Sequence, residues 1–96
     1  MPFKIKITAA AIIDLEEGFA YYNSRVANLG YKFIDEVHLS LNNIADRPFS
    51  FGERYKVVRG KLVSVFPYLI MLRIDEVRST VEILRIFNTY QNPAWR

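Results

Sequence analysis

The sequence predicts a single α+β domain over residues 1–96, in which an N-terminal strand and a two-helix hairpin precede a C-terminal antiparallel sheet of three to four strands. Three patterns predict this order. Apolar residues alternate with polar ones at the start, then recur at spacings of three and four, and finally gather in short runs from residue 55 onward. A chain of 96 residues has room for one modest hydrophobic core, so we expect one domain.

The first predicted strand lies at the N-terminus. The apolar residues Phe3, Ile5 and Ile7 alternate there with Lys4, Lys6 and Thr8. One face of this strand is therefore apolar and the other is cationic. Thr8 precedes Ala9, and a threonine in that position can cap a helix by accepting a hydrogen bond from its first turn. A helix is expected to begin at Ala9.

The first predicted helix carries one apolar stripe. Its members are Ile12, Leu15, Phe19, Tyr22 and Val26. Gly18 lies inside this pattern and costs about 1 kcal/mol relative to alanine, so close packing must compensate. Asn28, Leu29 and Gly30 then interrupt the periodicity.

The second predicted helix carries Phe33, Val37, Leu41 and Ile44 on one face and ends before Pro48. A short loop joins it to the first helix, which predicts a helical hairpin. Neither apolar stripe is stable in water, so both helices are expected to pack on a sheet.

Short apolar runs predict the sheet. The expected strands are Tyr55–Val58, Leu62–Phe66, Tyr68–Asp75 and Thr80–Phe87. Residues 59–61 are expected to form a turn or bulge between the first two, and residues 75–79 a hairpin loop. Simple alternation in the last strand puts Val81, Ile83, Arg85 and Phe87 on one face, and the sequence leaves open which face of the sheet that is.

The chain lacks the residues that several classes of function require. The chain has no cysteine, which excludes a disulfide framework, a cysteine zinc site and a thiol nucleophile, and one histidine, which excludes a histidine-rich metal site. No glycine-rich phosphate loop is present, and we expect no cofactor and no metal. The longest apolar run, Val65–Leu72, falls well short of the roughly 20 residues that span a bilayer. The charged N-terminus is unlike a signal peptide, so we expect a soluble cytoplasmic protein with no membrane partner.

The isolated histidine and the neighbouring carboxylates are weak candidates for acid–base catalysis. These groups are His38, the pair Asp14 and Glu17, and the pair Asp35 and Glu36. We expect His38 to be partly buried or at the surface. The two carboxylate pairs fall on predicted helices near basic residues, so we expect them on solvated helix faces.

Charge is divided unevenly along the chain. Residues 1–52 have a net charge of −1 and residues 53–96 a net charge of +4, out of a total of +3. The basic half suits a polyanion or an acidic protein, although +3 is also an ordinary charge for solubility. A basic and aromatic surface on the sheet is the candidate for nucleic-acid contact, with Arg59, Lys61, Arg73, Arg85, Tyr90 and Trp95 as its members.

A set of motifs in order along the chain resembles the RelE/ParE superfamily of toxins from bacterial type II toxin–antitoxin systems. The motifs are Asp14-Leu15-Glu16-Glu17 with Ala20-Tyr21-Tyr22, Leu29-Gly30 with Phe33, Arg59-Gly60-Lys61-Leu62, Phe66-Pro67-Tyr68-Leu69-Ile70, and the run from Ile83 to Pro93. Each motif is weak alone, but their order and spacing agree with the strand, helix and sheet order predicted above.

The resemblance implies a small toxin held inactive by a cognate antitoxin, related to the toxins of plasmid stabilization systems. The RelE-like branch cuts mRNA in the ribosomal A site, whereas the ParE-like branch inhibits DNA gyrase without a catalytic step. The cutting branch uses basic residues, because without metal or histidine cations must stabilise the charge that develops on the phosphate.

The residues of the cutting branch are only partly present in this chain. Arg59 and Lys61 can replace the early lysines, but Leu69 occupies the middle arginine position and Asn88 a position that is often histidine or arginine. If the chain is a metal-independent mRNA endoribonuclease, the resemblance implies Arg59, Lys61, Arg85 and Tyr90 as its catalytic residues. The remaining candidates form a binding surface, with Arg73, Asn88, Gln91 and Trp95 as its members.

Three hypotheses follow from this incomplete match. The first is a ParE-like toxin that inhibits growth through a protein target such as DNA gyrase. The second is a RelE-like, ribosome-dependent mRNA endonuclease, and the third is a superfamily member with weak or no toxicity that retains antitoxin binding.

All three hypotheses imply a cognate antitoxin. We expect an extended or helical antitoxin segment along the groove between the helical hairpin and the sheet, in contact with the basic sheet face. Exposed apolar surface would also allow a homodimer when the chain is isolated.

Overall fold

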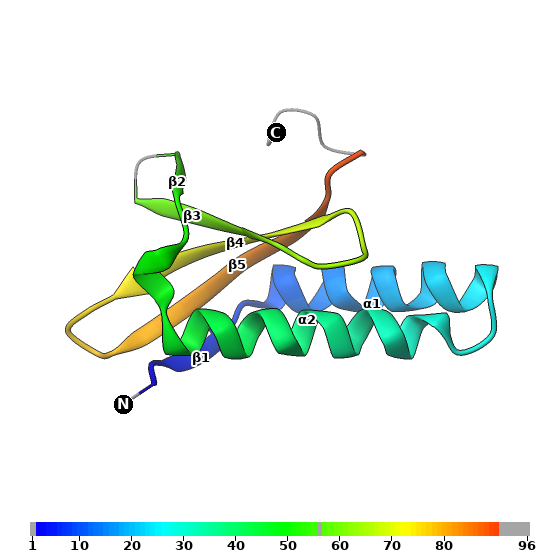
Figure 1. Ribbon diagram of the computed structural model, residues 1–96, viewed down its shortest axis with the longest axis horizontal. Helices are drawn as coiled ribbons and strands as arrows, with labels where there is room; N and C mark the ends of the chain where they lie inside the picture. The colour runs from blue at the N-terminus through cyan, green and yellow to red at the C-terminus, as the bar shows by residue number, and fades with distance from the viewer. Residues whose placement is uncertain (1, 56, 91–96) are drawn as a thin grey trace.

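The computed structural model describes residues 2–55 and 57–90, and it confirms the predicted α+β architecture. The elements in chain order are β1 (Lys4–Ile7), α1 (Ala9–Arg25), α2 (Leu29–Asp46), the 3-10 helix η1 (Pro48–Ser50), β2 (Glu53–Tyr55), β3 (Val58–Leu62), β4 (Tyr68–Asp75) and β5 (Thr80–Asn88). The strands form one sheet in the order β1-β5-β4-β3-β2. Both helices lie on one side of it (Figure 1). Neither helix within the described ranges is long and apolar enough to cross a membrane.

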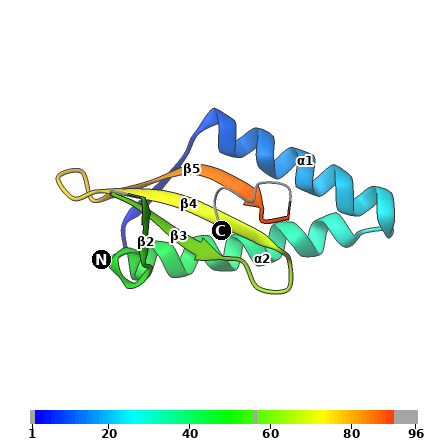
Figure 2. The same ribbon diagram turned by 90° about the horizontal axis from the view of Figure 1, so that it is seen from above.

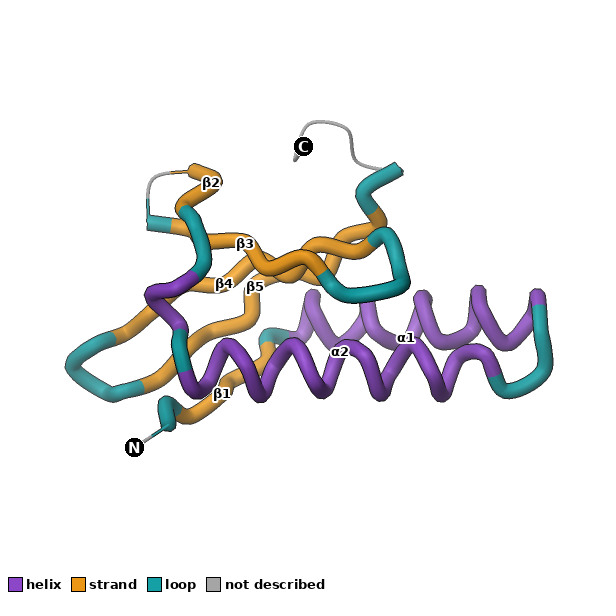
Figure 3. Tube along the Cα trace, in the orientation of Figure 1, coloured by secondary structure: helices purple, strands orange, loops and turns teal. Residues whose placement is uncertain are grey.

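The N-terminal strand joins the sheet from far away in the sequence. β1 pairs in parallel with β5, while β2 to β5 pair as antiparallel neighbours (Figure 3). Thr8 follows β1 and caps α1 as predicted, because its Oγ1 accepts a hydrogen bond from the Ala11 backbone N–H at 3.2 Å. The same hydroxyl donates to the Leu84 carbonyl oxygen at 3.0 Å. One side chain therefore starts the helix and ties it to β5.

The buried face of α2 is the predicted one, since Phe33, Val37, Leu41 and Ile44 are all in the core. The predicted stripe of α1 is wrong at both ends. Ile12 is 46% exposed and Val26 is 58% exposed.

The fully buried residues of α1 are Ala11 and Gly18, while Leu15 and Tyr22 of the predicted stripe are partly buried and pack against the core. A β-carbon built on Gly18 would lie 2.6 Å from Phe33 Cε2. Gly18 therefore allows α1 to pack closely against Phe33 of α2. Beyond this contact the two helices diverge from the loop that joins them (Figure 2).

Two of the predicted strands had the wrong bounds. Residues 59–61 form the middle of β3, not a turn, and Gly60 pairs there with Met71 of β4. The predicted strand Tyr55–Val58 is divided, since β2 ends at Tyr55 and β3 begins at Val58.

The predicted strand Leu62–Phe66 is mostly loop, because Val65 adopts a positive φ of 75° that bends the chain. By contrast, β4 has the predicted bounds, and β5 extends one residue further than predicted.

A bulge in β5 changes which side chains share a face. Leu72 pairs with Ile83 but Met71 pairs with Arg85, so Leu84 is an extra residue in β5. Ile83 and Ile86 therefore both belong to the core under the helices, although they are three residues apart.

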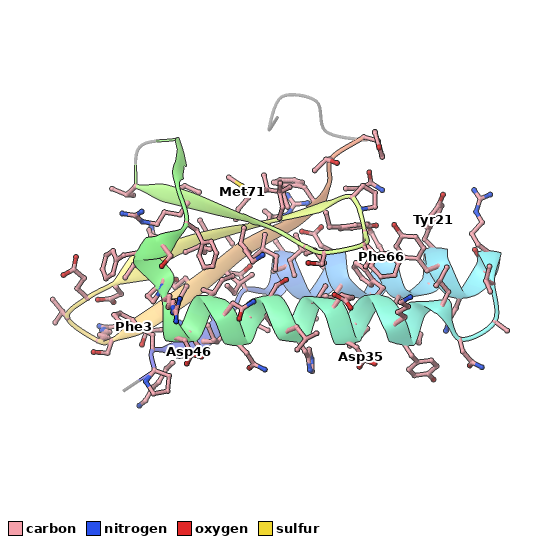
Figure 4. All side chains as sticks on the ribbon, viewed as in Figure 1. Phe3, Tyr21, Asp35, Asp46, Phe66 and Met71 are labelled. Carbon is pink, nitrogen blue, oxygen red and sulfur yellow. The ribbon has the colours of Figure 1, made fainter. Side chains whose placement is uncertain are left out.

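The opposite face of the sheet carries a smaller apolar cluster. Its members are Leu69, Met71, Phe87, Val58 and Leu84. Figure 4 labels Met71 near the helix-free side and Phe66 between the sheet and the helices. The predicted alternation of Ile83 with Phe87 on one face is wrong, because it assumed a regular strand.

Candidate functional site

An open pocket lies between α1 and the end of β5 and has a volume of about 290 Å³. Helix α1 contributes Asp14, Glu17 and Tyr21, with Gly18 between them, and the sheet contributes Tyr68, Arg85 and Asn88. The lining residues of α1 share one face because they are three and four positions apart. The pocket thus combines two carboxylates, one guanidinium, a carboxamide and two tyrosines.

Asp14 is the most constrained polar residue of this pocket. Its Oδ2 accepts hydrogen bonds from Arg85 Nε and from the Ile86 backbone N–H, both at 2.8 Å, and its Oδ1 accepts from an Arg85 terminal nitrogen at 2.9 Å. Its side chain is only 10% exposed. The expectation of a solvated helix face is therefore wrong for Asp14. The hydrogen bonds that Arg85 donates to Asp14 also raise the pKa of Arg85 above its ordinary value, so Arg85 remains a cation.

Tyr68 and Tyr22 form a phenolic pair beside the pocket. Burial raises the pKa of Tyr22 to about 12, with a further contribution from nearby Tyr68. Burial also raises the pKa of Tyr68, although a hydrogen bond with the Asn88 side chain opposes that effect. Both phenols are therefore neutral near pH 7 and serve as hydrogen-bonding groups.

Arg59 and Lys61 lie on the side of the sheet that faces the helices. They pair with Leu72 and Ile70 of β4, which belong to the main core, and directly opposed residues share a face. Arg59 donates a hydrogen bond to the Phe51 carbonyl oxygen at 2.8 Å.

Lys61 donates to the Leu62 carbonyl oxygen at 2.8 Å and lines a second pocket of about 440 Å³. Arg47, beyond the end of α2, also lines this second pocket. The two predicted residues Arg59 and Lys61 therefore lie together near the end of α2, apart from the first pocket.

The other predicted residues are distributed over different parts of the fold. Arg73 lies on the sheet face opposite the helices and forms an ion pair with Glu82 at 2.6 Å. Arg85 and Asn88 line the first pocket, and Asn88 Oδ1 accepts a hydrogen bond from the exposed Tyr90 through its backbone N–H at 2.9 Å. Gln91 and Trp95 lie outside the described residues. The structure thus brings together Arg59 with Lys61, and Arg85 with Asn88, but not all of the predicted cations.

Sequence reasoning missed the α1 side of the first pocket. Asp14 follows Ala11 by three residues and precedes Gly18 by four, which is the spacing of one helix face. Had Ala11 and Gly18 been chosen as the inward residues, Asp14 would have been predicted at the buried boundary. Within residues 2–55 and 57–90, no cluster of three or more histidine, cysteine, aspartate or glutamate side chains could hold a metal ion.

Comparisons with known proteins were informative only at the level of structure. No protein-family model matches the chain, and no curated protein matches it. A chain of the chromosomal ParDE TA system from P. aeruginosa has a similar structure, with a TM-score of 0.76, 18% sequence identity, and coverage of 88% of this chain and 92% of that one. A chain of the toxin–antitoxin complex RelBE2 from Mycobacterium tuberculosis is also similar, with a TM-score of 0.58, 19% identity, and coverage of 90% and 96%. The chain therefore has the RelE/ParE-type fold that the resemblance in its sequence implied.

Proposed function

We propose that this chain is the toxin of a type II toxin–antitoxin system, that it is ParE-like, and that it inhibits growth through a protein target such as DNA gyrase. A cognate antitoxin neutralises it. The fold supports this proposal, since the TM-score is 0.76 with a chain of the ParDE system and 0.58 with a chain of RelBE2. The proposed targets lie in the cytoplasm, and we propose that location for the chain.

The separation of the candidate catalytic cations supports a mechanism without RNA cleavage. Metal-independent cleavage needs several donors and cations around one phosphate. Here the guanidinium of Arg85 is held by Asp14 on α1, whereas Arg59 and Lys61 lie near η1 and the end of α2. Binding to a protein target requires no such convergence.

A RelE-like endonuclease is the second candidate function. Arg59 and Lys61 lie two positions apart on β3 and share a face, and Arg47 lines the same pocket as Lys61. Two cations at one pocket suit a phosphate group. In this alternative Arg59, Lys61, Arg85 and Tyr90 carry the reaction.

Induction of the chain alone in a bacterium separates these functions. Growth, plasmid supercoiling and the 5′ ends of transcripts are followed in the same cultures. We expect growth arrest with loss of negative supercoiling and no new 5′ ends inside reading frames. New ends inside translated frames would contradict the proposal and favour the endonuclease, and unimpeded growth would favour the weakly toxic alternative.

Paired variants sharpen this test. The double variant R59A/K61A should retain growth arrest if a protein is the target, provided that its amide NMR spectrum shows a folded chain. Under the endonuclease alternative the same variant should lose both arrest and new transcript ends. R78A is a matched control that removes a cation from the β4–β5 turn.

Antitoxin binding gives a further test of the electrostatic part of the proposal. The basic half of the chain predicts that the complex weakens as salt concentration rises. A dissociation constant that is unchanged between low and high salt would contradict an electrostatic contact with the basic half of the chain.

A further inference from the structure

Glu17 is the carboxylate of the α1–β5 pocket that forms no hydrogen bond or ion pair in the described part of the chain, although its charge contributes to the raised pKa of nearby Arg85. It lies three residues after Asp14 on the same face of α1, is exposed, and lines the pocket beside Tyr21. Asp14, by contrast, accepts three hydrogen bonds from β5. In this pocket the Asp14 carboxylate is already hydrogen-bonded to β5, whereas the Glu17 carboxylate is available to a ligand.

The charge of the lining favours a cation over an anion. Asp14 and Glu17 supply two negative charges and Arg85 supplies one positive charge, so the lining has a net charge of −1 in a chain whose net charge is +3. Burial is the main cause of the raised pKa of Tyr68 in the pocket wall, and the charges of Asp14 and Glu17 make smaller contributions in the same direction. An anion would meet repulsion here, since the cation of the lining already has a bidentate partner.

The chain itself shows how this region binds guanidinium groups. Arg85 lies 4.7 Å from the centre of the Phe87 ring while it pairs with Asp14, and Arg25 lies 4.9 Å from the centre of the Tyr21 ring. A carboxylate next to an aromatic ring is a favourable site for a planar guanidinium, which forms two parallel hydrogen bonds and stacks on the ring. Glu17 and Tyr21 likewise place a carboxylate and an aromatic ring in the lining of one pocket.

We propose that the α1–β5 pocket is a recognition site for the guanidinium group of an arginine side chain from a polypeptide partner. Glu17 pairs with the guanidinium, the Tyr21 ring packs against it, and the Asn88 carboxamide and Tyr68 hydroxyl line the inner wall. The inference rests on the proposed function only for the identity of the partner, which is the antitoxin, because the pocket lies between α1 and the sheet, where the antitoxin segment is expected.

The size and chemistry of the pocket favour a side chain over a free amino acid. A volume of about 290 Å³ is at the lower limit for small-molecule pockets, and the pocket is open on one side. An incoming side chain fits while its own backbone remains outside. A free amino acid would bring an α-carboxylate, for which the lining offers only Arg85, already held by Asp14.

The test uses the purified chain and two-dimensional amide NMR spectra. The probe is arginine blocked as its N-acetyl, N′-methylamide, and the matched probe is the citrulline derivative, which has the same shape without the charge. We expect saturable shifts of the Gly18, Ile86 and Asn88 amides with the arginine probe. The citrulline probe should give no saturation.

Two variants test whether the charge of Glu17 binds the arginine probe. Glu17→Gln should weaken binding of the arginine probe by up to about fivefold, the upper limit for one exposed ion pair. Glu16→Gln is the matched control, because it removes the same charge from the preceding residue of α1, which does not line the pocket. Its affinity should stay within about twofold of the unaltered chain.

Three outcomes would overturn the inference. The first is absence of saturable shifts at the Gly18, Ile86 and Asn88 amides. The others are equal binding of the citrulline probe and equal weakening of binding by Glu16→Gln and Glu17→Gln. Tighter binding of free L-arginine than of the blocked probe would overturn the polypeptide origin. Because the titration uses the chain alone, its result is independent of growth arrest, and the pocket and the proposed function can fail separately.

Discussion

Asp14 of α1 and Arg85 of β5 form a two-contact ion pair between residues 71 positions apart in the sequence. The same carboxylate accepts the Ile86 backbone N–H at 2.8 Å. These contacts follow the bulge at Leu84, where β5 departs from regular alternation. Asp14 thereby fixes the position of α1 against the end of β5 and forms one wall of the pocket.

The two partners of this ion pair should differ in their effect on stability. Asp14→Ala leaves the partly buried Ile86 N–H without its acceptor and should lower the free energy of unfolding by about 1–3 kcal/mol. Arg85→Ala leaves that hydrogen bond intact, and Arg85 is 45% exposed, so the loss should be about 0–1 kcal/mol. Urea unfolding measures both. Equal losses would show that the backbone contact adds nothing to the ion pair.

Gly18 should be intolerant of a methyl group. Gly18→Ala improves helix propensity by about 1 kcal/mol, but its β-carbon would lie 2.6 Å from a ring carbon of Phe33, and overpacking of this kind costs about 1–3 kcal/mol. We expect a net decrease in melting temperature. Gly52→Ala is the control, since no atom lies within 4 Å of the position that its β-carbon would take, and it should leave the melting temperature unchanged or slightly raised. An unchanged melting temperature for Gly18→Ala would argue against this close approach.

The hydroxyl of Thr8 should contribute more than an ordinary helix cap. It accepts from the Ala11 N–H and donates to the Leu84 carbonyl oxygen at the bulge. Thr8→Val keeps the shape but removes both hydrogen bonds, with an expected loss of about 1–2 kcal/mol in the free energy of unfolding. Thr8→Ser keeps the hydroxyl and should retain most of the stability. Similar losses for the two variants in chemical denaturation would attribute the effect to packing.

Alkaline pH should destabilise the fold through the partly buried Tyr22. The pKa of Tyr22 is about 12 in the folded chain, above its ordinary value of 10.0, so the folded chain holds this proton more tightly than the unfolded chain does. The associated stabilisation is complete below about pH 10 and decreases as pH rises toward about 12. Tyr22→Phe should therefore show a shallower loss of unfolding free energy between about pH 9 and pH 11 in urea titrations. An unchanged slope would show that Tyr22 does not cause the loss.

The elements with strong local signals could be predicted from the sequence. The capping threonine Thr8, the core face of α2 and the bounds of β4 are all encoded by neighbouring residues. The position of residues 59–61 could not be predicted in this way. Their polar and glycine composition is typical of a turn, but hydrogen bonding to β4 holds them in a strand.

The candidate site was predicted less completely than the fold. Arg85 and Asn88 were identified as candidates, but Asp14 on α1, which pairs with Arg85, was assigned to a solvated face. The order of hydrophobic and polar residues by itself determined the α+β class and most of the elements, because burial of apolar side chains imposes the periods of helix and strand. The tertiary structure alone decided the bulge at Leu84, the close approach at Gly18 and the pairing of Asp14 with Arg85. Each of these depends on contact between segments far apart in the chain, and no local pattern of residues records such a contact.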